Sequence, residues 1–147
     1  MNPKRPLGAW IAYAAALWAA VFAVFHFIWA AGWYPLLNAE GARAAFATPW
    51  KWTFDVVVAG ICIVAVPVAL GLVMPWGRRL PYRIVYRLAW IGSALLLLRL
   101  AAASIQTCYL IAVGRFSFAM IGIWDWWFLL GTILFSVSTW HAKRLGA

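Results

Sequence analysis

Four long apolar stretches account for most of the chain, and few charged residues interrupt them. They run over about residues 7–31, 53–74, 88–113 and 123–141. A helix needs about 20 predominantly apolar residues to cross the hydrocarbon core of a membrane, and each stretch reaches that range. The pattern therefore predicts an all-α protein with a single domain over residues 1–147, folded as a bundle of four transmembrane helices.

The composition agrees with lipid, rather than water, as the main solvent of the chain. Apolar residues make up 67% of the 147 positions and charged residues only 10%, far from the balance of a soluble domain. The formal net charge of +9 comes from short segments between the apolar stretches, not from a folded, water-facing surface. The charge predicts membrane lipids as partners and argues against nucleic acid.

The distribution of basic residues predicts the orientation of the helices. Eight of them belong to the two ends of the chain and to the segment 75–87: Lys4, Arg5, Arg78, Arg79, Arg83, Arg87, Lys143 and Arg144. Three belong to the opposite, outer connections: Arg43, Lys51 and Arg115. Because positive residues concentrate on the cytoplasmic side, we expect both termini in the cytoplasm and a multi-pass protein of the inner membrane. The tryptophans, which favour interfaces, cluster at both predicted ends of the spans and leave only Trp18 near a midplane.

The amino-terminal stretch and the first outer connection carry two further expectations. Lys4 and Arg5 imitate a signal peptide, but a cleavable apolar region has about 7–15 residues and this one is much longer, so we expect a retained anchor. In the connection, residues 36–46 predict a short helix along the membrane interface, which Thr48-Pro49 would end.

His26 is the first candidate for chemistry, because an ionisable side chain inside a membrane span is a functional-site candidate by default. It lies near the outer end of the first stretch and shares a helical face with Phe22 and Trp29. The alternative is a neutral imidazole that is hydrogen-bonded inside the bundle. The sequence leaves both interpretations open.

Arg99 is the most costly residue, since an arginine at the centre of a membrane helix is penalised by about 2.5–3.5 kcal/mol. Gln106 lies seven residues further on and shares its face, which predicts a polar stripe toward the bundle interior. The partner of Arg99 is either a carboxylate, Asp55 or Asp125, or the backbone carbonyl of Ile63, which Pro67 leaves without its helical donor.

Asp55 and Asp125 stand near the amino ends of the second and fourth stretches, where a carboxylate favours the positive helix terminus and caps free N–H groups. Capping is the structural interpretation of both. The functional one notes that both helices begin on the outer side. Both acids, His26 and Gln106 would then converge in the outer half of the bundle.

The sequence offers no established cofactor or metal motif, and we assign no cofactor. His26 and His141 lie near opposite ends of their spans, too far apart to ligate one haem. Cys62 and Cys108 each stand alone in an apolar run, which predicts free thiols. A mixed metal site from His26 and both cysteines would lack any spaced ligand pair.

Three segments resemble a group of small bacterial four-helix membrane proteins known only as a domain of unknown function. They are His26-Phe27-Ile28-Trp29-Ala30-Ala31-Gly32, Leu97-Leu98-Arg99 and Trp124-Asp125-Trp126-Trp127-Phe128-Leu129-Leu130-Gly131. The chain departs from the group in having one glycine after Trp-Ala-Ala instead of two, and it lacks a Pro-Leu-Cys element in the fourth helix. The resemblance implies that His26, Arg99 and Asp125 belong to a common pattern, but it implies no reaction.

The leading functional hypothesis is a membrane module that holds a small amphipathic or lipid-like ligand in an outer-leaflet pocket. Its candidate lining is His26, Trp29, Asp55, Arg99, Gln106 and Asp125. A second hypothesis is an isomerase or redox partner that moves a proton through a His/Asp pair. A third is a structural or accessory subunit, forming a homo-oligomer or joining another membrane subunit, in which the polar residues fix helix packing.

Overall fold

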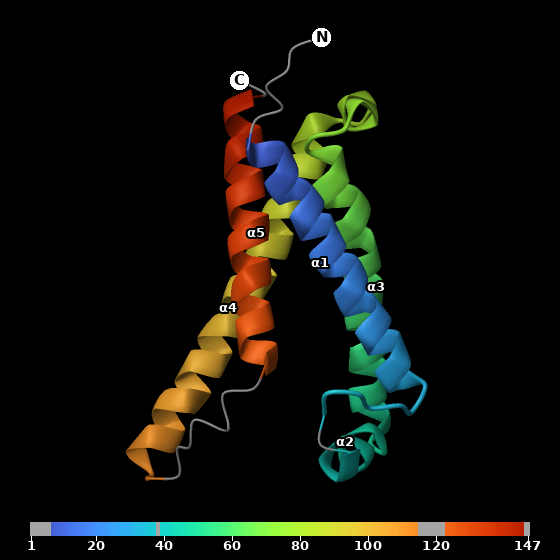
Figure 1. Cartoon of the computed structure of the whole chain (residues 1–147), viewed down its shortest axis with the longest axis vertical. Helices are drawn as coiled ribbons and strands as arrows, with labels where there is room; N and C mark the ends of the chain where they lie inside the picture. The colour runs from blue at the N-terminus through green and yellow to red at the C-terminus, as the bar shows by residue number, and fades with distance from the viewer. Residues whose placement is uncertain (1–6, 38, 115–122, 146–147) are drawn as a thin grey trace.

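The computed structural model describes residues 7–37, 39–114 and 123–145, and all of its regular structure there is helical. Four long helices, joined by two short elements, occupy the four predicted stretches, so the all-α class is confirmed (Figure 1). They are α1 (Leu7–Ala30), α2 (Ala39–Phe46), α3 (Pro49–Gly71), the 3-10 helix η1 (Pro75–Arg79), α4 (Tyr82–Ala112) and α5 (Ile123–Leu145). Lys4, Arg5 and Arg115, which contribute to the charge bias, lie outside the described residues.

Three helices, α1, α3 and α4, are each long and apolar enough to cross a membrane. Helix α5 is similarly long and carries several hydroxyl side chains. Thr132 donates a hydrogen bond to the carbonyl of Phe128 at 2.8 Å, and Thr139 donates to that of Phe135 at 2.7 Å. These hydroxyls are therefore satisfied within their own helix, as polar groups away from water need to be.

Small residues let α1 pack closely against its neighbours. Its buried positions include Ala12, Ala15, Ala19 and Ala23, and on α3 the facing stripe includes Ala59 and Ala69. Helices in membranes associate largely through van der Waals contact, which short side chains bring within range. The close packing of α1 on α3 and on α5 forms the core of the molecule.

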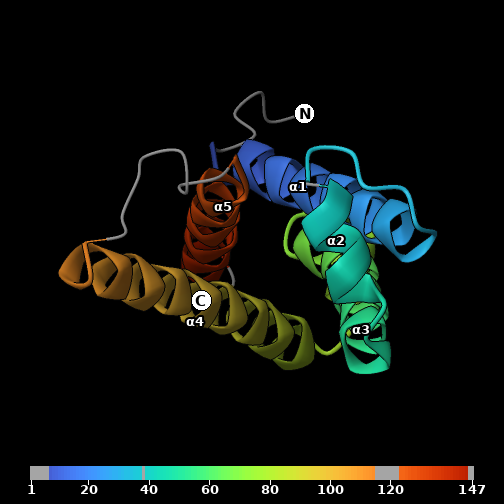
Figure 2. The same ribbon diagram turned by 90° about the horizontal axis from the view of Figure 1, so that it is seen from below.

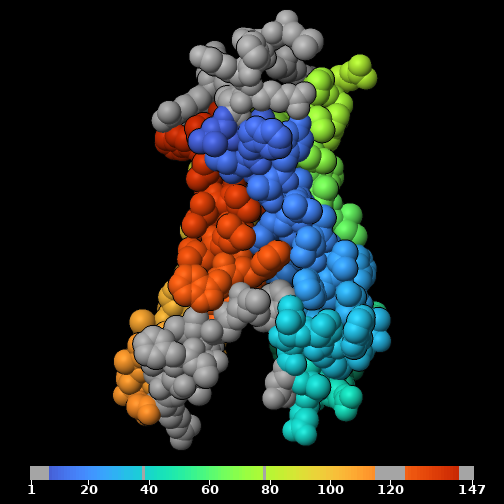
Figure 3. Space-filling view, viewed as in Figure 1, coloured from blue at the N-terminus to red at the C-terminus, as the bar shows by residue number. Residues whose placement is uncertain are grey.

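Helix α4 packs along only part of its length. Its buried residues, Val85, Ala89 and Ser93, all lie in its first half, and from residue 94 onward no residue of the helix is buried. Figures 1 and 2 show α4 diverging from α3 toward the end of the molecule that holds α2. In Figure 3 the end of α4 (orange) and α2 (cyan) lie apart at this end of the molecule.

The opposite end of the bundle is closed by η1 and by the start of α4. The hydroxyl of Tyr82 donates a hydrogen bond to the carbonyl of Ala142 on α5 at 2.8 Å. Gly77 approaches the backbone of Gly71 so closely that a β-carbon at position 77 would collide with the carbonyl of residue 71. We refer to this end, where α1 begins and α5 ends, as the inner end, and to the end with α2 as the outer end.

The outer connection contains the predicted short helix. It spans Ala39–Phe46 within the expected range, and Pro49 is the first residue of α3, so the Thr48-Pro49 pair separates the two helices as expected. Between α1 and α2 the chain turns at Gly32, whose φ of 88° suits a residue without a β-carbon, and at Leu36, with φ of 62°.

Candidate functional site

The candidate site is built on the outer part of α1, where the backbone places Phe22, His26 and Trp29 on one face. All three side chains are buried. The His26 ring lies edge to face with Phe22, with 4.5 Å between ring centroids, and with Trp29, with 5.0 Å. The shared face predicted from the sequence is therefore present, and it surrounds the imidazole with aromatic rings.

Asp55 of α3 supplies the polar partner of His26. The Nδ1 atom of His26 is hydrogen-bonded to the Oδ1 atom of Asp55, and the two side chains are 9% and 7% exposed. When Asp55 is ionised, Nδ1–H donates this bond, and the carboxylate fixes both the tautomer and the orientation of the ring. This is the one ion pair between residues that the structure describes.

Each partner retains one buried polar atom without a hydrogen bond among the described residues: Nε2 of His26 and Oδ2 of Asp55. Buried polar groups are nearly always paired, because an unmade hydrogen bond costs about 1–3 kcal/mol. The pair thus carries unused hydrogen-bonding capacity at the centre of an aromatic shell. Neutral imidazole offers an acceptor at Nε2, protonated imidazole offers a donor there, and Oδ2 is an acceptor when ionised.

The connection from α1 to α2 is attached to the same place by tryptophans. The indole N–H of Trp29 donates to the carbonyl of Pro35 at 3.3 Å, and that of Trp52 donates to the carbonyl of Ala30 at 3.1 Å. The Trp29 ring therefore contacts His26 on one side while its N–H holds the connection. One side chain therefore links this connection to the surroundings of His26.

The capping role expected for Asp55 is wrong. Helix α3 begins at Pro49 after the N-cap Thr48, which makes no side-chain capping bond, so Asp55 lies well inside the helix and faces α1. Proline at the first helical position was the signal that could have placed this start correctly. Asp125, in contrast, does lie in the first turn of α5, and its side chain is half-buried.

Arg99 pairs with an aromatic ring instead of a carboxylate. Its guanidinium carbon lies 4.5 Å from the centroid of the Phe128 ring of α5. Among the described residues it forms no ion pair with either aspartate and no hydrogen bond to Ile63. Arg99 and Gln106 are both exposed, because α4 has diverged from α3 at their level, so the polar stripe does not face a packed interior as predicted.

Two aromatic side chains separate Arg99 from His26. Phe128 packs edge to face on Phe22 at 5.2 Å, and Phe22 contacts His26. Thus His26, Trp29 and Asp55 form one cluster, Arg99 lies beyond Phe22 and Phe128, and Gln106 stands apart on α4. Among the described residues, no group of three histidine, cysteine or acidic side chains is placed to hold a metal ion, and Cys62 and Cys108 are both free thiols.

Comparisons of the chain with models of protein families, with curated proteins and with solved structures gave no match.

Proposed function

We propose that the chain is a four-span membrane protein whose inner end, as defined above, faces the cytoplasm. Three helices meet the length and hydropathy of a span, and α5 packs along α1 and α4 with its hydroxyls bonded to its own backbone. A helix embedded in a bundle in this way tolerates more polar residues than one that faces lipid on all sides. The bias of basic residues supports the cytoplasmic placement of the inner end.

We further propose that the protein binds a small amphipathic or lipid-like molecule in the outer half of the membrane. The buried His26–Asp55 pair carries this proposal. Ionisable residues inside a membrane are expensive to bury, and a site kept only for packing gains nothing from an unpaired Nε2 and Oδ2. A ligand hydroxyl or carbonyl would satisfy these atoms, while Phe22 and Trp29 would cover its apolar part.

Entry of this ligand requires the site to open, since both polar side chains are buried. Trp29 joins the site to the outer connection through its hydrogen bond to Pro35. Release of the Trp29 bond to Pro35 would expose His26. The ligand pocket proposed here is centred on His26, Trp29 and Asp55, with Arg99 and Asp125 outside its first contacts and Gln106 more distant.

Proton transfer to the bound molecule is a second candidate function, favoured by the same hydrogen bond. A carboxylate that orients an imidazole leaves the other ring nitrogen ready to accept or return a proton, which is the usual arrangement of a histidine general base. An isomerase or a redox partner of a lipophilic carbonyl compound needs such a group. Binding is common to both functions and is tested first.

The test is to purify the full chain in mild detergent and to identify co-purified small molecules by mass spectrometry. We expect a reproducible amphipathic compound whose amount per folded chain falls at least about fivefold in His26→Ala and Asp55→Asn, as loss of one buried hydrogen bond to a charged group predicts. Arg43→Ala, an exposed change on α2, is the matched control. Equal ligand content in all four proteins would reject the pocket, and a stoichiometric protein partner would favour the accessory subunit.

A further inference from the structure

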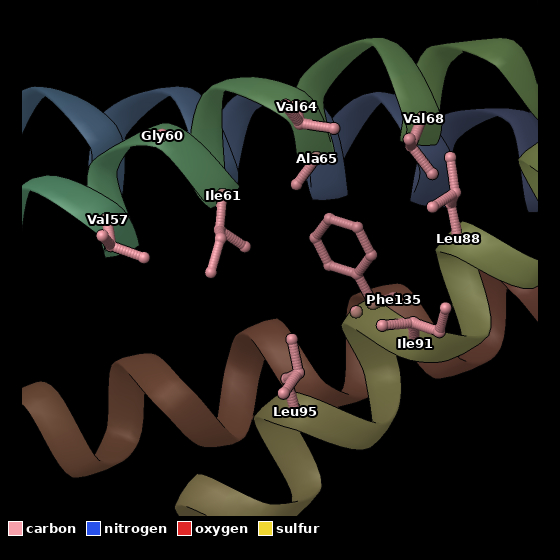
Figure 4. A pocket seen from close by; sticks show the side chains of 11 residues that line it. Val57, Gly60, Ile61, Val64, Ala65, Val68, Leu88, Ile91, Leu95 and Phe135 are labelled. Carbon is pink, nitrogen blue, oxygen red and sulfur yellow. The ribbon is translucent and has the colours of Figure 1, made fainter. Parts of the chain in front are cut away.

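A second site is suggested by an apolar groove between α3 and α4, whose lining includes neither His26 nor Asp55. Its volume is about 410 Å³, and Phe135 of α5 forms its base (Figure 4). Every lining side chain is apolar, with Val57 and Leu95 toward the outer end and Val68 and Leu88 facing each other at the inner end.

Two glycines keep the groove open. A β-carbon at Gly60 would meet no atom within 4 Å, and one at Gly92 would reach only the Cδ1 atom of Phe135, at 3.9 Å. Larger side chains at these positions would occupy the groove without colliding with the backbone. The volume of the groove therefore depends on glycine at positions 60 and 92.

The dimensions of the groove fit a single hydrocarbon chain. From Val57 to Val68 the helix rises about 16 Å, roughly half of the about 30 Å hydrocarbon core and thus the depth of one leaflet. An acyl chain is much narrower than a helix, which is about 10 Å wide, and the apolar lining over this length suits one such chain.

Positive charge gathers on η1 and on the first turns of α4, near the level of the inner end of the groove. Arg87 immediately precedes the groove residue Leu88, Arg83 lies one turn further in, and Arg79 ends η1; all three are exposed. The three acidic residues of the chain, Glu40, Asp55 and Asp125, all belong to the outer half. No aspartate or glutamate side chain is therefore placed near the arginines.

An aromatic ladder marks the same level as a membrane interface. Tyr82 stacks on Tyr86 at 5.8 Å, and Tyr86 meets Trp90 edge to face at 6.3 Å. Tyrosine and tryptophan prefer the headgroup region, where arginine side chains also extend toward water. The arginines are thus placed at headgroup depth, beyond the inner end of the apolar groove along α4.

We propose that the groove and these arginines form one binding site for an acidic phospholipid of the leaflet at the inner end. One acyl chain lies between α3 and α4, and the phosphate binds Arg83 and Arg87. Basic pockets between membrane helices on the cytoplasmic side are known to recognise such headgroups. The proposal rests on the membrane-spanning arrangement above but not on the ligand of His26.

The test is native mass spectrometry of the full chain in detergent, titrated with phosphatidylglycerol or with phosphatidylcholine of identical acyl chains. We expect tighter binding of phosphatidylglycerol, weakened about fivefold by Arg87→Gln and about 25-fold by Arg83→Gln/Arg87→Gln. Phosphatidylcholine binding should change less in these variants, because its choline cation offsets the charge of the phosphate. Gly60→Leu should weaken both lipids about tenfold or more, because it displaces buried methylenes of the chain.

Matched controls separate local from general effects. Ala101→Leu adds the same kind of bulk two and a half turns along α4 from Gly92, on the opposite face of the helix, and Arg43→Gln removes an outer charge; neither should alter lipid binding. His26→Ala should also leave it unchanged, so the two sites succeed or fail separately. If leucine at position 60 impairs folding, Gly60→Val provides the smaller filling change.

Equal affinity of the wild-type chain for the two phospholipids would overturn the headgroup assignment. Unchanged binding in folded Gly60→Leu or Gly60→Val protein would overturn the groove. A wild-type dimer that becomes monomeric in these variants, with no change in lipid binding, would assign the groove to a second copy of the chain instead.

Discussion

The indole ring of Trp18 on α1 lies against α5 at Gly131, in the space that a side chain at position 131 would occupy. A β-carbon there would come within 2.8 Å of the Cη2 atom of Trp18 and still closer to two other ring atoms. The ring is held in place by its N–H, which donates to the carbonyl of Trp127 at 2.9 Å. The α1–α5 contact therefore depends on the absence of a side chain at one position.

Gly131→Ala is expected to destabilise the folded chain by about 1–3 kcal/mol, since Trp18 must leave its position or the helices must separate. Gly60→Ala is the matched control, because its added carbon meets no atom within 4 Å. Unfolding in mixed detergent and SDS, followed by circular dichroism, measures both. Equal stability of the two variants would contradict the close contact.

The His26–Asp55 pair should behave as a coupled unit. His26→Leu leaves Asp55 buried without its partner, and Asp55→Leu does the same to His26. The two single changes together should therefore lower the free energy of unfolding by more than the double change does. A double-mutant cycle on the free energy of unfolding should give a coupling energy of about 0.5–3 kcal/mol. Strictly additive effects would mean that the two side chains do not interact in the membrane.

The contact of Arg99 with Phe128 predicts a smaller, ring-dependent coupling. A desolvated guanidinium over an aromatic face contributes about 0.5–2 kcal/mol, so Phe128→Leu should destabilise the wild-type chain by that amount. In an Arg99→Gln background the cost should shrink, and Phe128→Tyr should retain the stability. Phe54→Leu, at an exposed phenylalanine, supplies the control. The same cost for Phe128→Leu in both backgrounds would show that the ring acts only by packing.

The two cysteines should differ in reactivity. Cys62 is buried between α3 and its neighbours at 6% exposure, whereas Cys108 is exposed on the part of α4 that packs on no other helix. A small lipophilic maleimide should therefore label about one thiol per folded chain rapidly, and Cys108→Ser, but not Cys62→Ser, should abolish that reaction. Rapid labelling of Cys62 in folded protein would indicate that α1 and α3 separate.

The helices could be predicted from hydrophobicity, but the pairing of polar residues could not. Apolar length identifies a span regardless of which helices touch, so the four stretches and α2 agree with the structure. His26, Asp55 and Arg99 were each identifiable by the cost of burial. Their partners depend on two features of packing: the start of α3 at Pro49, which sets the face on which Asp55 lies, and the divergence of α4 from α3. A run of apolar residues encodes neither feature. The α3–α4 groove depends on Gly60 and Gly92 lying in one lining, which is likewise a property of packing.

The number of spans is tested by the location of the carboxyl terminus. If α5 crosses the membrane together with α1, α3 and α4, the two ends of the chain share one side; if only those three cross, they lie on opposite sides. Green fluorescent protein fluoresces in the cytoplasm and alkaline phosphatase is active only outside it. Fusions after Trp76 and after Ala147 should therefore fluoresce, and a fusion after Ala45 should show phosphatase activity, as the eight-to-three bias of basic residues predicts. Phosphatase activity at Ala147 with the other two results unchanged would leave α5 on the membrane surface. A cytoplasmic signal at Ala45 would invert the whole arrangement and place the His26–Asp55 pair in the inner leaflet.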